Sequence, residues 1–115
     1  MRTKALLAVT LLSVTAATQA LTLEQSRGMV YAHCAGVYMA ASSVAFEQNR
    51  TGDYEKMSRL LSLASDGATT RIGNSKTTDI AESSVTQLLK AYRKNPILAE
   101  DKIAKESLTC SEYFK

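Results

Sequence analysis

The spacing of apolar residues predicts a protein built from α-helices. From residue 21 onward, apolar side chains recur every three or four positions, and no segment alternates apolar and polar residues as a half-buried strand does. We expect four helices joined by short turns, over residues 22–48, 53–72, 78–94 and 96–114. Short connections favour antiparallel neighbours, so the sequence predicts an all-α fold: an up-and-down four-helix bundle or a related three- to four-helix array.

Both ends of the first helix carry recognisable signals. Thr22 and Gln25 fit the capping box, in which the two side chains satisfy each other's backbone amide groups. Residues 49–52 form a polar break, where Gly52 suits a left-handed turn. Asp53 follows this break at a position typical of an N-cap, so we predict that it caps the second helix.

Similar signals mark the other two boundaries. Residues 73–75 read Gly-Asn-Ser, which is a stop signal for the second helix, and Thr78 or Asp79 is expected to open the third. Asn95 and Pro96 end the third helix and start the fourth, because proline is favoured at the first helical position after an asparagine cap.

Residues 28–46 contain no charged side chain, which sets the first helix apart from the others. One apolar stripe follows helical spacing, and we expect it to face the core: Leu23, Val30, Cys34, Val37, Ala41 and Val44. The segment approaches the roughly 20 residues that span a bilayer, but it lacks leucine and isoleucine and contains histidine, tyrosine and serine. We favour a central helix covered by the other three, with membrane association as the alternative.

Small residues recur at every fourth position of this helix, at Gly28, Ala32, Gly36 and Ala40. Such spacing allows a second helix to approach closely. It is compatible with tight packing inside the bundle, with a self-association face, or with a cavity that the small side chains leave open.

Several apolar side chains of the first helix lie outside its core stripe. Met39 and Phe46 are two of them, with the Gly36 and Ala40 surface between them. Exposed apolar area concentrated in one place usually marks an interaction site, and methionine adapts to partner surfaces. We therefore predict that Gly36, Met39, Ala40 and Phe46 belong to an interface with another protein or with a second copy. The alternative is that the other helices cover this side as well.

The N-terminal segment has the order of a secretory signal peptide. Arg2 and Lys4 precede an apolar run that is too short to span a bilayer, and small or polar residues then lead to Ala20. We expect residues 1–20 to be cleaved as a signal peptide, which leaves residues 21–115 as one exported domain. It would be periplasmic in a bacterium and secreted otherwise. A buried N-terminal helix or an uncleaved anchor is the alternative.

Removing this segment changes the charge balance. The full chain has 14 basic and 11 acidic side chains, and Arg2 and Lys4 are two of the basic ones. The expected mature domain is therefore nearly neutral, with 12 basic against 11 acidic side chains. Binding of nucleic acid needs a clustered basic face, so we expect no nucleic-acid partner.

Cys34 and Cys110 are the two cysteines, and both lie in the expected mature domain. Disulfides persist outside the cytoplasm, so we expect a bridge within the chain; an intermolecular bridge and free thiols are the alternatives. Counting about 1.5 Å per helical residue along antiparallel helices places the two cysteines within one helical turn of each other. An interhelical disulfide is therefore compatible with the predicted bundle.

Candidate chemistry is sparse in this chain. His33 is the single histidine and lies in the apolar first helix, where we expect a packed core or boundary residue. Zinc sites need three or four ligands at recognisable spacing, and no haem-attachment, nucleophile-elbow or phosphate-loop motif is present in the sequence. We expect no metal, no cofactor and no enzymatic activity. Residues 49–51 form an N-glycosylation sequon in the expected first turn.

These expectations favour a small binding protein that acts outside the cytoplasm. It would present a rigid helical surface to another protein, as an inhibitor, an immunity-type protein, an adaptor or an assembly factor. The alternative is a carrier of a small apolar ligand or lipid, held in a cavity beside Gly28, Ala32, Gly36 and Ala40.

Overall fold

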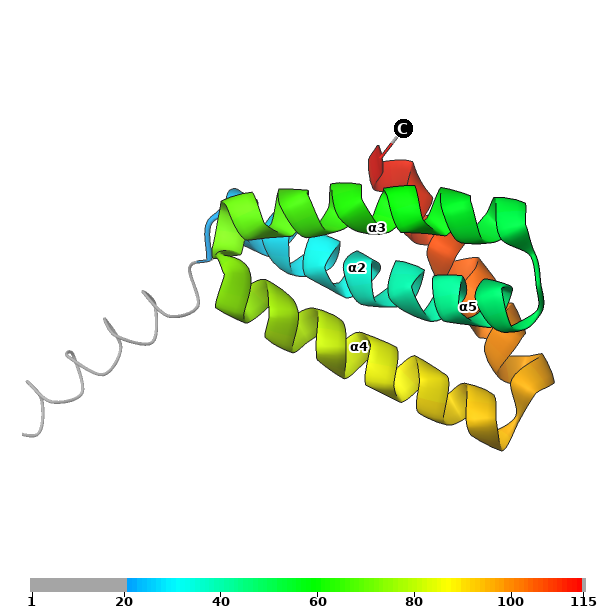
Figure 1. Ribbon diagram of the computed structural model, residues 1–115. Helices are drawn as coiled ribbons and strands as arrows, with labels where there is room; N and C mark the ends of the chain where they lie inside the picture. Colours follow the sequence, from blue (N-terminus) through cyan, green and yellow to red (C-terminus); the bar gives the residue numbers. More distant parts are fainter. Residues whose placement is uncertain (1–20, 115) are drawn as a thin grey trace, which may run out of the picture.

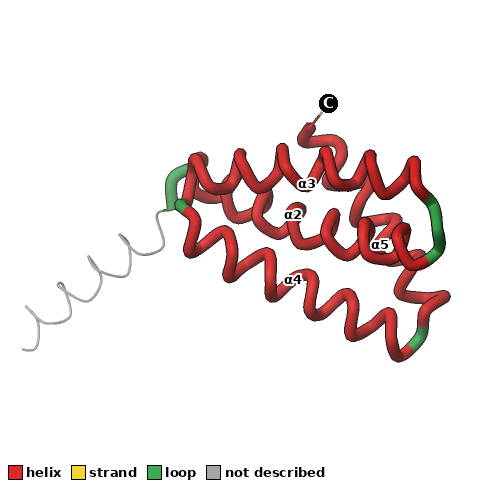
Figure 2. The backbone as a smooth tube through the Cα atoms, in the orientation of Figure 1, coloured by secondary structure: helices red, strands yellow, loops and turns green. Residues whose placement is uncertain are grey.

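The computed structural model describes residues 21–114, which are helical almost throughout. The helices are α2 (Leu23–Glu47), α3 (Thr51–Ile72), α4 (Asn74–Lys94) and α5 (Pro96–Ser111), followed by the short 3-10 helix η1 (Glu112–Phe114). The chain reverses direction at each connection (Figure 1), and the connections are short (Figure 2). The predicted all-α bundle is confirmed, whereas the predicted signal peptide lies outside the described residues.

α2 is the central helix of the bundle, and α3, α4 and α5 all pack against it. It supplies the largest fully buried side chains of the core, Cys34, Val37, Tyr38 and Val44. The predicted central position is therefore confirmed. The predicted core stripe is wrong at Leu23 and Val30, which are exposed. Both residues precede Cys34, which is bonded to Cys110 in the last turn of α5, so they lie on the part of α2 beyond this junction.

Two of the predicted helix boundaries are confirmed in detail. The Thr22 Oγ1 accepts a hydrogen bond from the Gln25 amide at 3.0 Å, and the Gln25 Oε1 accepts one from the Thr22 amide at 3.1 Å. These bonds complete the capping box and satisfy backbone amides that a helix start leaves free. At the start of α5, the Asn95 Oδ1 accepts from the Leu98 amide at 3.3 Å, directly before Pro96.

The turn between α2 and α3 differs from the prediction. Asn49, with a φ of 58°, adopts the left-handed conformation that was expected of Gly52. Asparagine tolerates this region better than most residues do, so α3 begins earlier and includes Gly52. Asp53 does not cap α3; the N-cap is Arg50, and the Asp53 carboxylate instead lies 3.3 Å from the Arg50 guanidinium.

The turn between α3 and α4 is shorter than predicted. Gly73, with a φ of 85°, is the one residue between the two helices, and α4 begins at Asn74 rather than at Thr78 or Asp79. Glycine adopts this conformation without a steric penalty, so a single residue reverses the chain. The connection therefore holds α3 and α4 together at this end of the bundle.

Candidate functional site

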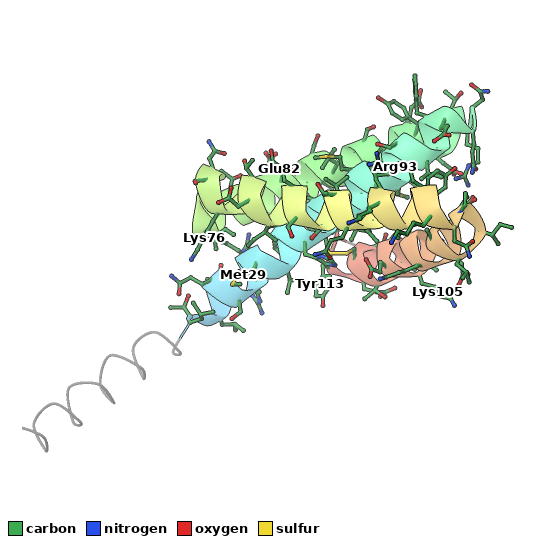
Figure 3. All side chains as sticks on the ribbon, turned by 90° about the horizontal axis from the view of Figure 1, so that it is seen from below. Met29, Lys76, Glu82, Arg93, Lys105 and Tyr113 are labelled. Carbon is green, nitrogen blue, oxygen red and sulfur yellow. A yellow bond between two sulfur atoms is a disulfide. The ribbon has the colours of Figure 1, made fainter. Side chains whose placement is uncertain are left out.

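A disulfide joins the central helix to the last helix. Cys34 of α2 and Cys110 of α5 are bonded, with their Cα atoms 5.6 Å apart (Figure 3). Both residues are buried in the core. The predicted pairing within one chain is confirmed, and the Cα separation lies in the range that disulfides favour. Such bonds are typical of an oxidising compartment.

The structure separates the four residues of the predicted interface. Met39 is 36% exposed and Phe46 is 71% exposed, whereas Gly36 and Ala40 are buried. A Cβ atom on Gly36 would lie only 2.6 Å from the carbonyl oxygen of Ala81, so α4 covers this part of α2. The expectation of a surface at Gly36 and Ala40 is therefore wrong, because the absence of a large side chain allows α4 to pack there.

Phe46 has an aromatic partner that the sequence did not indicate. The rings of Phe46 and Tyr54 lie 5.7 Å apart at an angle of 53°, and both are exposed. They line a shallow depression of about 320 Å³ at the α2–α3 turn, together with Ala45, Asn49, Arg50, Thr51 and Glu55. Tyr54 is missed because it lies on another helix, although its position eight residues after Phe46 across a short turn could have indicated the contact.

Met39 and Phe46 lie on a part of α2 that the other helices leave exposed. α3 and α4 meet at Gly73 and separate toward the other end of the bundle, where α2 shows between them (Figure 1). Met39 and Phe46 lie seven residues apart in α2, which places them on one face. Ser43 lies between them, and its hydroxyl donates to the Met39 carbonyl at 3.0 Å. We call Met39, Phe46 and Tyr54 the hairpin surface.

A second concave region lies on another side of α2, between α3 and α5. This α3–α5 groove has a volume of about 340 Å³. Its apolar lining comes from three helices, with Ala41, Val44 and Ala45 of α2, Met57 of α3, and Ile103, Ala104 and Leu108 of α5. The sequence did not indicate it, because the groove depends on the distance between two helices that are far apart along the chain.

Polar groups border the α3–α5 groove. The Arg50 guanidinium lies 3.3 Å from the Asp53 carboxylate and 3.5 Å from the Glu100 carboxylate, and it thereby ties the α2–α3 turn to α5. Lys56 also lines the groove. The Ser107 Oγ is buried in its wall and has no hydrogen-bond partner among residues 21–114. The groove thus combines an apolar floor with charges of both signs at its rim.

The groove is not where a ligand cavity was expected. A Cβ atom on Gly28 would lie 2.7 Å from the Ile72 Cγ2 of α3, and the corresponding atom on Gly36 would meet α4. Ala32 and Ala40 are fully buried. The expected cavity beside these small residues is therefore filled by neighbouring helices, because small side chains draw helices together instead of leaving space.

Similarity to known proteins does not assign a function to either surface. No protein-family model, curated protein or solved structure matches this chain. A function therefore has to be inferred from the residues that form these surfaces.

His33 is exposed rather than packed in the core, with 47% of its side chain accessible, and it contacts side chains of two other helices. Its Nδ1 lies 2.7 Å from the Ser84 Oγ of α4, and its Nε2 lies 3.7 Å from the Glu106 Oε2 of α5. A serine, a histidine and a carboxylate also form hydrolase triads. Here, however, Ser84 is buried beside Gly36, where α2 and α4 are in close contact, and it lines neither of the two concave regions described above. We interpret the cluster as a set of polar contacts that connects α2 with α4 and α5.

Two further properties bear on the chemistry of the chain. Among the described residues, no group of three or more histidine, cysteine or acidic side chains is placed to hold a metal ion. α2 is long and apolar enough, by length and composition, to cross a membrane, with a mean hydropathy of 1.3 over its most apolar window. The other helices bury 56% of this window, which favours the interpretation of α2 as a core helix.

Proposed function

We propose that this protein is exported and binds another protein through the hairpin surface. The observation that carries the proposal is the exposed aromatic pair of Phe46 and Tyr54, with Met39 exposed on the same side of α2 as Phe46. Aromatic residues and methionine are enriched at protein interfaces, and a few aromatic side chains often supply most of the binding energy. Exposed apolar area concentrated in one place usually marks an interaction site, and the rings of Phe46 and Tyr54 lie in contact with each other.

The hairpin surface is supported by an ordered turn. The Arg50 amide donates to the Ala45 carbonyl at 2.8 Å, and the Tyr54 amide donates to the Arg50 carbonyl at 2.9 Å. The Arg50 side chain is in turn paired with Glu100 of α5. A surface that is already ordered loses little conformational entropy on binding, which favours its use as a preformed interface.

Export is the second part of the proposal. It is supported by the charged, apolar and small segments of residues 1–20 and by the Cys34–Cys110 disulfide. Amino-terminal sequencing of the protein recovered from outside the cytoplasm should give Leu21 as the first residue. An intact N-terminus that begins at Met1 would contradict cleavage.

Capture of the partner tests the binding function. The mature protein, immobilised through an added C-terminal tag, is exposed to an extract of its own compartment, and bound proteins are identified by mass spectrometry. We expect a protein that is captured by the wild type, is lost with the Phe46→Ser and Tyr54→Ser double variant, and binds again when both components are purified. Leu63→Ser is the matched control, because Leu63 is also exposed on α3 but lies outside the hairpin surface.

The same experiment has a clear negative outcome. If the double variant captures the same proteins as the wild type does, or if no captured protein binds the purified chain directly, the hairpin surface is not the binding site. Thermal unfolding is measured for each variant in parallel. A cooperative transition shows that the variant is folded, so that a loss of capture is not caused by unfolding.

The α3–α5 groove favours a second candidate function, the carriage of a small apolar ligand. Its volume of about 340 Å³ lies near the lower end of the range for small-molecule sites, which is about 300–1,000 Å³. Native mass spectrometry of protein purified from its own compartment would detect a bound molecule. We expect Ala104→Trp to exclude that molecule, because residue 104 lines the groove. A protein that carries no ligand in its native compartment would rule out this function.

A further inference from the structure

The side of α5 that faces away from α2 carries exposed apolar residues, and one of them, Leu108, also borders the α3–α5 groove. Ile97, Leu98 and Leu108 are 84%, 68% and 70% exposed. Asp101 and Lys105 lie between them and form an ion pair at 2.8 Å, and Lys105 lies at the outer edge of the bundle (Figure 3). We call these five residues the α5 outer face. Exposed apolar area concentrated on one face often marks an interaction site.

The order of these residues is symmetric about position 103. Leu98 and Leu108 lie five positions before and after it, and Asp101 and Lys105 lie two positions before and after it. If two copies of α5 pack antiparallel and cross at the level of residue 103, Leu98 of one copy lies opposite Leu108 of the other. In the same arrangement, Asp101 of one copy lies opposite Lys105 of the other.

This arrangement places the leucines of the two copies against each other and places each acidic side chain opposite a basic one. Two-fold symmetry requires a surface to be complementary to itself, and most soluble oligomers use such contacts. The ion pair that each copy forms within α5 would join that of the second copy in a ring of alternating charges, which fixes the register of the two helices. Ile103 itself faces the core and is buried, so it does not take part in the contact.

We propose that two copies of the protein associate through the α5 outer face, with the two α5 helices antiparallel about a two-fold axis. This goes beyond the proposed function, because it uses a different helix and leaves Met39, Phe46 and Tyr54 outside the contact. A second copy is the partner for which both the apolar and the charged positions of the α5 outer face are complementary.

Charge reversal tests the proposal. In sedimentation equilibrium experiments on the disulfide-bonded mature protein, the wild type should dimerise. Asp101→Lys places only lysines at the charged positions of the face, and Lys105→Asp places only aspartates there, so each variant alone should be monomeric. An equimolar mixture of the two variants should form a heterodimer, because the lysines of one variant then face the aspartates of the other.

The mixing experiment separates the proposed contact from effects inside one helix. Loss of the Asp101–Lys105 pair within a chain changes both variants, but it cannot make them associate with each other. A wild type that stays monomeric up to its solubility limit, or a mixture that stays monomeric, would overturn the proposal.

Serine substitutions test the apolar part of the face. Leu98→Ser and Leu108→Ser should each raise the dissociation constant of the dimer about tenfold or more, because each removes apolar area from the contact. Leu63→Ser, an exposed leucine of α3, is the matched control and should leave the constant unchanged. The double variant Phe46→Ser and Tyr54→Ser should also still dimerise; if it does not, the second copy binds the hairpin surface and the α5 proposal is wrong.

Discussion

Phe46 of α2 and Tyr54 of α3 hold their rings 5.7 Å apart across the turn that joins the two helices. Phe46 is 71% exposed, so the pair lies in contact with water and not in the core. Such a ring pair contributes on the order of 1 kcal/mol beyond its buried area. The pair is therefore available for binding at a small cost to the stability of the fold.

The first prediction concerns the stability of variants on the hairpin surface. Met39→Ser combined with Phe46→Ser should lower the free energy of unfolding by no more than about 1–2 kcal/mol, because neither side chain is buried. Denaturant unfolding of the double variant and the wild type measures this difference. A loss of about 3–5 kcal/mol, which is typical of large side chains removed from a core, would show that this side of α2 is core.

The disulfide should supply a large part of the stability of the domain. Cys34 and Cys110 are separated by 76 positions, and closure of a loop of this length is worth up to about 4.5 kcal/mol in the chain-entropy estimate. The Cys34→Ser and Cys110→Ser double variant should therefore unfold at a much lower denaturant concentration. Non-reducing electrophoresis and thiol titration of the wild type should show a monomeric chain without free thiol. Two titratable thiols would contradict the bond.

Two glycines should respond in opposite directions to alanine. Gly36→Ala should destabilise the fold by about 1–3 kcal/mol, because the new Cβ would lie 2.6 Å from the Ala81 carbonyl oxygen of α4. Gly52→Ala is the control: apart from its chain neighbours and the backbone of α3 itself, nothing lies within 4 Å of its Cβ position, and the change should stabilise the helix by about 0.4–1 kcal/mol. Equal effects at both positions would mean that α4 does not approach α2 as described.

Tyr38 should make the fold sensitive to alkaline pH. Burial raises the pKa of its phenol above the ordinary value of 10.0, and the hydrogen bond with Ser111 offsets part of this effect. The phenol therefore ionises first in the unfolded chain, so its contribution to stability is complete below about pH 10 and is lost as the pH rises through the folded-state pKa. Tyr38→Phe should reduce the loss of unfolding free energy between about pH 9 and pH 11. The same pH dependence in both proteins would contradict this account.

Local signals in the sequence were sufficient where neighbouring residues determine the structure. The capping box at Thr22 and the Asn95-Pro96 start of α5 formed as predicted, because their hydrogen bonds connect residues three positions apart. The start of α4 could not be predicted in this way. Gly73 alone makes that turn, and whether one residue suffices depends on how α3 and α4 pack on α2.

Burial at the candidate site depended on contacts between helices that are distant in sequence. The sequence around Gly36 is compatible with an exposed or a buried position. Its burial follows from the packing of α4 over α2. Met39 and Phe46 could be predicted as exposed apolar residues, and the short separation between Phe46 and Tyr54 across the turn could have indicated their contact. The sequence therefore indicates which helix carries surplus apolar residues, and the packing decides which of them face solvent.

Site-specific crosslinking tests the central claim, binding of another protein at the hairpin surface, most directly. A photoreactive benzoylphenylalanine replaces Phe46 in one variant and Leu63 in a second, and both proteins are irradiated in their native compartment. We predict a covalent adduct with another protein from position 46 and none from position 63, because only the first residue lies on the hairpin surface. Equal adducts at both positions, or none at position 46, would contradict the proposed function.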